Sequence, residues 1–214
     1  MAYLKRIRSV RHKRTQFFFL VLLTVAGCAT LKQCAYEGVH RDQWQQPEKV
    51  IELLAIKPGE EVADLGAGGG YFTFRLAKAV GPNGTVYAID VDPDMVQLLE
   101  KEAKDKDLRN VDVIRARPDN PLLQSKSVDL IFTVDTYHHL NDRVDYFARA
   151  KKFLRPNGRI AIIDFNRNAW LEGLWRHYTP TEFIKREMEN AGYRLQKEYD
   201  FLERQSFLIF TPAP

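Results

Sequence analysis

A glycine-rich turn and one acidic residue carry the clearest chemical pattern in the sequence. Gly66, Gly68 and Gly70 follow a short apolar run and precede a stretch with helical spacing. Glycines let the backbone turn sharply and approach a ligand closely, because they carry no side chain. Asp90 ends the next apolar run, twenty residues after Gly70. A carboxylate there can accept hydrogen bonds from both hydroxyls of a ribose. The pattern therefore predicts a nucleoside-binding site.

A second carboxylate distinguishes between kinds of nucleoside ligand. Asp64 lies two residues before Gly66, and the glycines are spaced G-x-G-x-G. A dinucleotide site usually has the spacing G-x-G-x-x-G and no acid at this point. A negative charge would repel a pyrophosphate and favour a positively charged ligand. The sequence favours a cationic nucleoside, with a nicotinamide or flavin site and a plain solvated turn as alternative interpretations.

A cluster of polar residues, Asp135 to His139, follows the fourth apolar strand expected along the chain. Ligands of open α/β sheets bind at this carboxyl edge. His138 and His139, with Tyr137 beside them, are candidate catalytic residues that orient a substrate or accept a proton. A structural histidine is the alternative. Consecutive residues that leave a strand point to different sides, so we expect no metal ion shared by the two histidines and Asp135.

An alternation of strands and helices must position these residues. The expected strands are 61–65, 85–89, 111–116, 128–134, 159–165, 194–202 and 206–210. The expected helices begin at 47, 71, 92, 142 and 180, the last after a capping box at 179–182. This order predicts an α/β fold, a doubly wound and mainly parallel sheet of seven strands. The last two strands are joined by a link too short for a crossover, which predicts an antiparallel strand at the C-terminal end.

The constellation of Asp64, the glycine turn and Asp90 resembles that of the class I S-adenosylmethionine-dependent methyltransferases, and the resemblance extends over about residues 41–210. It implies a Rossmann-like methyltransferase fold with S-adenosyl-L-methionine as cofactor. In that family the first-strand acid and the glycine loop hold the amino-acid end of the cofactor, and the second-strand acid holds the ribose. The Asn/Asp-Pro-Pro-aromatic motif of enzymes that methylate bases is missing after residue 134, which disfavours that class.

The same resemblance assigns further cofactor-binding positions. Val91 is expected to wall the adenine, and Asp119, in the loop after the third strand, to bind its amino group. Asp135 is expected at the cofactor edge of the fourth strand. Two segments with aromatic and basic residues, around Arg41 and at 170–178, either cover the cofactor cleft or pack on the core.

The first residues resemble a secretory signal. A basic stretch precedes the apolar run 17–27, which is shorter than the roughly 20 residues that span a bilayer. Residues 25–28 resemble the lipobox of bacterial lipoproteins, which implies lipidation of Cys28. An uncleaved anchor and a cytosolic protein with a mis-chosen start are the alternatives. We therefore divide the chain into a signal peptide or anchor at 1–27, a linker at 28–46 and a methyltransferase domain at 47–214.

The amino-acid composition limits the classes of partner and site that the protein can have. Six of the 32 basic residues lie in the first 14 positions, which leaves 26 basic against 28 acidic residues in the remainder. A near-neutral body gives no general electrostatic case for nucleic-acid binding. Two cysteines exclude a disulfide framework and a four-thiolate zinc site. We expect a membrane-tethered methyltransferase of the bacterial cell envelope with a small-molecule or envelope-associated acceptor. The alternative is a nucleoside-binding module that has lost catalysis.

Overall fold

The computed structural model describes residues 40–169 and 178–214, with one compact unit that begins at His40. The candidate signal or anchor at 1–27, Cys28 and the linker up to residue 39 lie outside the described residues, as does most of the 170–178 segment. Within the described part of the chain, no helix has the length and apolar character needed to cross a membrane.

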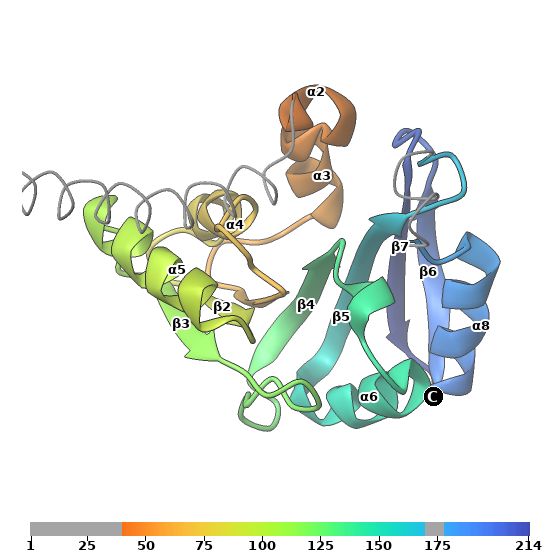
Figure 1. Ribbon diagram of the computed structural model, residues 1–214. Helices are drawn as coiled ribbons and strands as arrows, with labels where there is room; N and C mark the ends of the chain where they lie inside the picture. Colours follow the sequence, from red (N-terminus) through yellow and green to blue (C-terminus); the bar gives the residue numbers. More distant parts are fainter. Residues whose placement is uncertain (1–39, 170–177) are drawn as a thin grey trace, which may run out of the picture. The chain divides into compact units, whose positions relative to one another are not determined.

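A single seven-stranded sheet runs through the domain in the order β3-β2-β1-β4-β5-β7-β6 (Figure 1). Its strands are β1 (Glu61–Leu65), β2 (Thr85–Asp90), β3 (Val111–Arg115), β4 (Val128–Val134), β5 (Leu154–Phe165), β6 (Tyr193–Tyr199) and β7 (Gln205–Pro212). The first five strands are mutually parallel, and β7 is antiparallel to both β5 and β6. The predicted fold class is confirmed, including the antiparallel strand at the end.

Helices cover both faces of this sheet. They are α2 (Arg41–Gln45), α3 (Pro47–Leu54), α4 (Thr73–Val80), α5 (Pro93–Asp105), α6 (Arg143–Ala150) and α8 (Thr181–Asn190). Apolar side chains of α3 and α4 pack with alternate residues of β1, β2, β4, β5 and β7 in one buried cluster. Side chains of α6 and α8 pack with the intervening residues in a second cluster. This alternation buries both faces, which is why the central strands are apolar throughout.

Of the two helix caps predicted from the sequence, one is confirmed and one is wrong. Asp92 caps α5 as predicted, because its Oδ1 accepts a hydrogen bond of 2.9 Å from the backbone N–H of Asp94. The capping box expected at 179–182 is wrong. Pro180 is the residue before α8 and no side chain caps the helix. Thr179, the predicted capping residue, instead donates its backbone N–H to the carbonyl of Phe165 in β5 at 3.2 Å, so a tertiary contact holds it outside the helix.

Two elements differ from the expected boundaries. Helix α2 lies within the segment that we assigned to the linker, and Gln45 in it is fully buried. Strand β5 begins at Leu154 and contains the expected turn at 156–158 as an irregularity of the strand, where the register with β4 shifts and Asn157 has φ of 68°. The first difference extends the domain at the carboxyl edge that carries the site, and the second lies at the opposite edge, where β4 and β5 begin.

Candidate functional site

The glycine turn connects β1 to α4 and is fastened to the end of β2. The backbone N–H groups of Gly66 and Ala67 donate to the carbonyl of Ile89 at 2.8 and 3.0 Å. The N–H of Gly68 donates to Oδ2 of Asp90 at 2.8 Å, and Asp92 donates its N–H to Oδ1 at 2.9 Å. The Asp90 carboxylate is therefore held in one orientation at the carboxyl edge, and each oxygen keeps acceptor capacity for a ligand.

Two glycines of the turn are required by close packing. Gly66 has φ of 81°, and a Cβ there would lie 2.0 Å from the hydroxyl oxygen of Thr136. Gly70 has φ of 86°, and a Cβ there would lie 2.5 Å from the ring of Phe74. A side chain at either position would have to displace its neighbour as well as adopt a strained backbone. Because Gly66 touches Thr136, the glycine turn also adjoins the segment that follows β4.

Asp64 is buried in β1, immediately before the glycine turn. The hydroxyl of Thr73, in the first turn of α4, donates to its Oδ2 at 2.6 Å. Burial raises the pKa of Asp64 to about 7, and the negative charge of Asp90 acts in the same direction. The hydrogen bond from Thr73 and the positive charge of Arg41 oppose this rise. The two acids that define the predicted site are thus electrostatically coupled.

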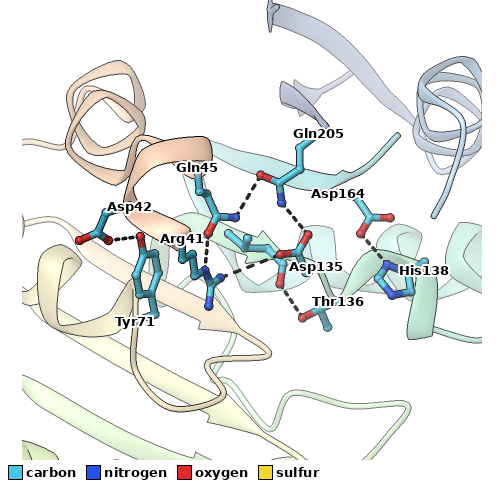
Figure 2. Close-up of polar contacts among 10 residues, drawn as sticks. Arg41, Asp42, Gln45, Tyr71, Asp135, Thr136, His138, Asp164 and Gln205 are labelled. Carbon is cyan, nitrogen blue, oxygen red and sulfur yellow. Dashed lines mark hydrogen bonds and ion pairs between the residues drawn. The ribbon is translucent and has the colours of Figure 1, made fainter. Parts of the chain in front are cut away.

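Asp135 is held by a chain of polar side chains that links α2, β4 and β7 (Figure 2). Gln205 donates to its Oδ1 at 2.6 Å, and Gln45 donates to Gln205 at 3.1 Å. Arg41 donates to Gln45, and its guanidinium lies 3.9 Å from Oδ2 of Asp135. Burial raises the pKa of Asp135 to about 7, although the charge of Arg41 lowers it.

Asp135 adopts a strained backbone with φ of 52°. This conformation is uncommon for a residue other than glycine and is concentrated at functional sites. Arg41 also lies 4.0 Å above the ring of Tyr71, which follows the glycine turn. The Arg41 segment, which we expected either to cover the cofactor cleft or to pack on the core, therefore packs against the predicted site. Gln45 and Gln205 were missed, because neutral amides more than 150 residues apart give no local sequence signal.

The histidine pair lies on a 3-10 helix, η1 (Tyr137–His139), which follows Asp135 and Thr136. Nδ1 of His138 is 2.7 Å from Oδ1 of Asp164, the next-to-last residue of β5. The rings of His138 and His139 have centroids 4.1 Å apart. The expectation that these side chains diverge is wrong, because it assumed continued strand geometry and the chain instead tightens into a helical turn. Asp164 was missed, although an acid inside the apolar run 160–165 was its signal.

The structure corrects the prediction that Tyr137 is a catalytic residue. Its side chain is fully buried and stacks on Phe147 with ring centroids 5.4 Å apart. Its hydroxyl donates to Glu187 of α8 at 2.7 Å, and burial together with this carboxylate raises the pKa of the phenol well above its usual range. The structure therefore places Tyr137 in the core between α6 and α8, and we remove it from the candidate catalytic residues.

The two residues expected around an adenine lie at the same sheet edge. Val91 follows Asp90 and is 51% exposed, an unusual position for a large apolar side chain. The chain then stays close to β2 after β3, because Ala116 donates its backbone N–H to the carbonyl of Asp90 at 2.8 Å. Asp119 is exposed in the short turn closed by the bridge between Arg117 and Asn120.

The donor set fits S-adenosylmethionine. An oriented carboxylate beside an exposed apolar side chain suits a ribose with its base, and a buried acid before a close-packed glycine turn suits a cationic group. Asp90, Val91, Asp64 and the turn from Gly66 to Gly70 are the residues that would hold it. In the described ranges 40–169 and 178–214, no group of three or more His, Cys, Asp or Glu side chains is placed to hold a metal ion.

Comparisons with known proteins agree with this arrangement. The family described as "Methyltransferase domain" matches residues 56–202. Aklanonic acid methyltransferase DauC of Streptomyces sp. (strain C5) is 33% identical over 114 residues, which cover 53% of this chain and 52% of that protein. Demethylmenaquinone methyltransferase of Geobacillus sp. (strain WCH70) is 21% identical over 159 residues, covering 74% and 68%. A crystal structure of a SAM-dependent methyltransferase from Aquifex aeolicus has a TM-score of 0.79 at 26% identity, covering 85% and 97%.

The chain belongs to the methyltransferase domain family, since the match spans more than half of its residues. Its fold is that of the S-adenosylmethionine-dependent methyltransferases, and the family and the fold together imply S-adenosylmethionine as the cofactor. The chain spans about half the length of the aklanonic acid methyltransferase.

Proposed function

We propose that the domain binds S-adenosylmethionine at the carboxyl ends of β1 and β2 and transfers its methyl group to a small organic acceptor. The observation that carries this proposal is the geometry of Asp90. Two backbone N–H groups, one from the glycine turn and one from the residue before α5, orient its carboxylate beside the exposed Val91. This geometry forms a preformed site for a ribose and its base. The site lies at the end of β2, next to the strand β1 that contains the buried Asp64.

Methyl transfer requires mainly that the protein hold the cofactor and the acceptor in position. When bound, S-adenosylmethionine supplies an electrophilic methyl group on a positively charged sulfur. The oriented oxygens of Asp90 accept hydrogen bonds from the ribose hydroxyls and set the depth of the ligand. Asp64 contributes negative charge beneath the glycine turn, where a low local dielectric strengthens its attraction to a cation. Arg41 balances the charges of Asp64 and Asp135 from the side of α2. Holding two reactants in line accounts for much of the rate in such transfers.

The acceptor is proposed to be a small molecule. Relatives named for aklanonic acid and for demethylmenaquinone act on small organic compounds by their names. The body of the chain also carries no excess of positive charge that would favour a nucleic acid. Asp119 and Asp135 remain candidate cofactor-binding residues, the first for the adenine amino group and the second at the cofactor edge of β4.

Two measurements on the full chain test this function. Isothermal titration with S-adenosylmethionine and S-adenosylhomocysteine should show binding to the wild-type protein. Incubation with methyl-labelled cofactor and a cell extract should then move the label into low-molecular-weight material. Binding without transfer would favour the alternative, a nucleoside-binding module without catalysis. Absence of binding would overturn the assignment of the site.

We also propose that the N-terminal segment tethers the domain to the bacterial cell envelope through lipidated Cys28. The support is sequence alone: a basic stretch, the apolar run 17–27 and the lipobox-like residues before the cysteine. A single acyl chain gives marginal membrane binding, so stable anchoring needs more than one.

Mass spectrometry of the mature N-terminus tests the tether. The expected result is an acylated Cys28 as first residue, abolished by Cys28→Ser, with Cys34→Ser as the matched control. Retention of residues 1–27 would instead indicate an uncleaved anchor. Recovery of the whole protein in the soluble fraction would contradict both forms of tethering.

A further inference from the structure

A buried histidine–aspartate pair lies beside the proposed methyl-transfer site. His138 lies on η1, just after the end of β4, and Asp164 lies near the end of β5, the parallel neighbour of β4 (Figure 2). Their side chains are 7% and 0% exposed, and Nδ1 of His138 is 2.7 Å from Oδ1 of Asp164. Thr136, two residues before His138, touches Gly66 of the glycine turn. The pair is therefore adjacent to the segment that holds the cofactor.

The hydrogen bond fixes the tautomer of the imidazole. A carboxylate can only accept a hydrogen bond, so Nδ1 of His138 carries the proton and Nε2 of the neutral ring keeps its lone pair. Nε2 lies on the side of the ring opposite Nδ1 and faces away from Asp164. Among the described residues, Oδ2 of Asp164 is buried without a hydrogen-bond partner. A buried carboxylate oxygen without a hydrogen-bond partner lowers the stability of the fold. The same carboxylate is suited to stabilise an imidazolium.

Aromatic side chains surround this pair. The ring of Phe165 lies 6.4 Å from that of His138 and 6.0 Å from that of Trp44 on α2. His139 adds a fourth ring, 4.1 Å from His138. Trp44 and Phe165 are partly exposed, so two of these four mutually tilted rings present a weakly polar aromatic surface beside the histidine. Such surfaces favour planar ligands through offset stacking.

We propose that His138 is the general base of the transfer, that Asp164 positions it, and that the acceptor is a planar molecule with a weakly acidic enol or phenol hydroxyl. This inference rests on the proposed methyltransferase function and names its substrate class. The hydroxyl proton moves to Nε2 of His138 as the acceptor attacks. The electron pair of the acceptor forms the new bond to the methyl carbon, and the carbon–sulfur bond breaks with its pair left on sulfur. The imidazolium, paired with Asp164, then returns its proton to water.

The first arm of the test is independent of catalysis. Long-range ¹H–¹⁵N spectra of the ¹⁵N-labelled full chain report the tautomer of each of its five histidines. We expect one Nδ1–H histidine that disappears in His138→Asn and returns to a mainly Nε2–H form in Asp164→Asn. A wild-type His138 that is protonated on Nε2 when neutral would overturn the proposal, because no lone pair would then face the acceptor.

The second arm measures transfer of labelled methyl groups to the organic-solvent extract of cells. We expect His138→Asn to lower the rate on the order of 10²-fold or more and Asp164→Asn to lower it less. S-adenosylhomocysteine affinity should change by less than about threefold in either variant. His40→Asn and Asp145→Asn, which replace exposed residues of the same types, are the matched controls.

The pH profile separates a base from a structural histidine. Within residues 40–169 and 178–214, Asp164 on β5, His139 on the same turn and Asp135 after β4 are titratable groups around His138. The wild-type rate should rise with pH to a plateau, whereas the residual rate of His138→Asn should continue to rise as hydroxide replaces the base. A wild-type rate in His138→Asn overturns this role alone. Absence of transfer by the wild-type protein overturns the proposed function, and this role with it.

Discussion

The backbone N–H of Gly68 points at Oδ2 of Asp90 from 2.8 Å, so the glycine turn after β1 and the acid at the end of β2 are one connected unit. The two motifs are 22 residues apart in the chain. Their connection means that the ribose-binding carboxylate and the turn cannot move independently. Loss of the acid is therefore expected to affect both ligand contacts and loop order.

Asp90→Asn should weaken S-adenosylhomocysteine binding by roughly 10- to 100-fold, because hydrogen bonds to a charged group contribute about 1.5–3 kcal/mol each. The amide nitrogen would also face one of the two backbone N–H donors. Isothermal titration measures the affinity, and Asp105→Asn, at an exposed position of α5, is the matched control. Equal affinities of wild type and Asp90→Asn would remove Asp90 from the site.

Gly66→Ala should destabilise the domain by roughly 3 kcal/mol or more, since strain at a positive φ adds to a collision with Thr136. Gly59→Ala is the matched control, because Gly59 also has a positive φ, 88°, but a Cβ there would meet no atom within 4 Å. This control should lose only about 1–2 kcal/mol. Urea unfolding of both variants gives the comparison, and equal losses would show that the contact with Thr136 is irrelevant.

Binding of the cofactor should strengthen as pH rises through about 7. Burial raises the pKa of Asp64 to about 7 in the free protein, and a cationic ligand favours the ionised acid. Binding must then release a proton. Affinity should increase roughly tenfold between pH 6 and pH 7.5, a range in which the ligand amino group stays mostly protonated. Titrations in two buffers of different ionisation enthalpy count the proton. Asp64→Asn should flatten this dependence, and a flat wild-type profile would contradict it.

Asp135→Asn should reduce the loss of stability on going from acid to neutral pH. The pKa of Asp135 is raised to about 7 by burial, so the folded chain binds its proton more tightly than the unfolded chain does. This contribution is present below about pH 4 and is lost as pH rises through about 7. We expect the variant to gain on the wild type in unfolding free energy between pH 4.5 and pH 7.5. Urea unfolding at the two values measures the difference, with Asp145→Asn as control. A difference independent of pH would assign no titration to Asp135 in this range.

The sequence predicted the central strands well because they are buried on both faces. β1 and β4 begin and end at the predicted residues, and Asp92 caps α5 as expected. Buried strands leave continuous apolar runs that local inspection can find. The capping box before α8 was wrong because the helix begins one residue later than predicted, and Thr179 contacts Phe165 of a distant strand through its backbone N–H.

The site was predicted only where its residues follow a motif. Asp64, the glycine turn and Asp90 meet at one edge because parallel strands end together. Asp164 and Gln205 reach the same edge through pairings of β5 with β4 and β7, which no local pattern encodes. The prediction that Tyr137 is catalytic failed although the residue follows β4 as expected. Its side chain is directed by the hydrogen bond to Glu187 on α8.

Strand β7 is synthesised after β6, yet it lies between β5 and β6 in the sheet. Until residues 205–212 leave the ribosome, β6 has no neighbour to pair with and the flank of β5 stays open. The backbone groups at the edge of β5 therefore stay unpaired until β7 has been synthesised. An unpaired strand edge is a surface to which strands of other nascent chains can pair. Premature termination within β7 would leave two exposed flanks rather than one shortened end.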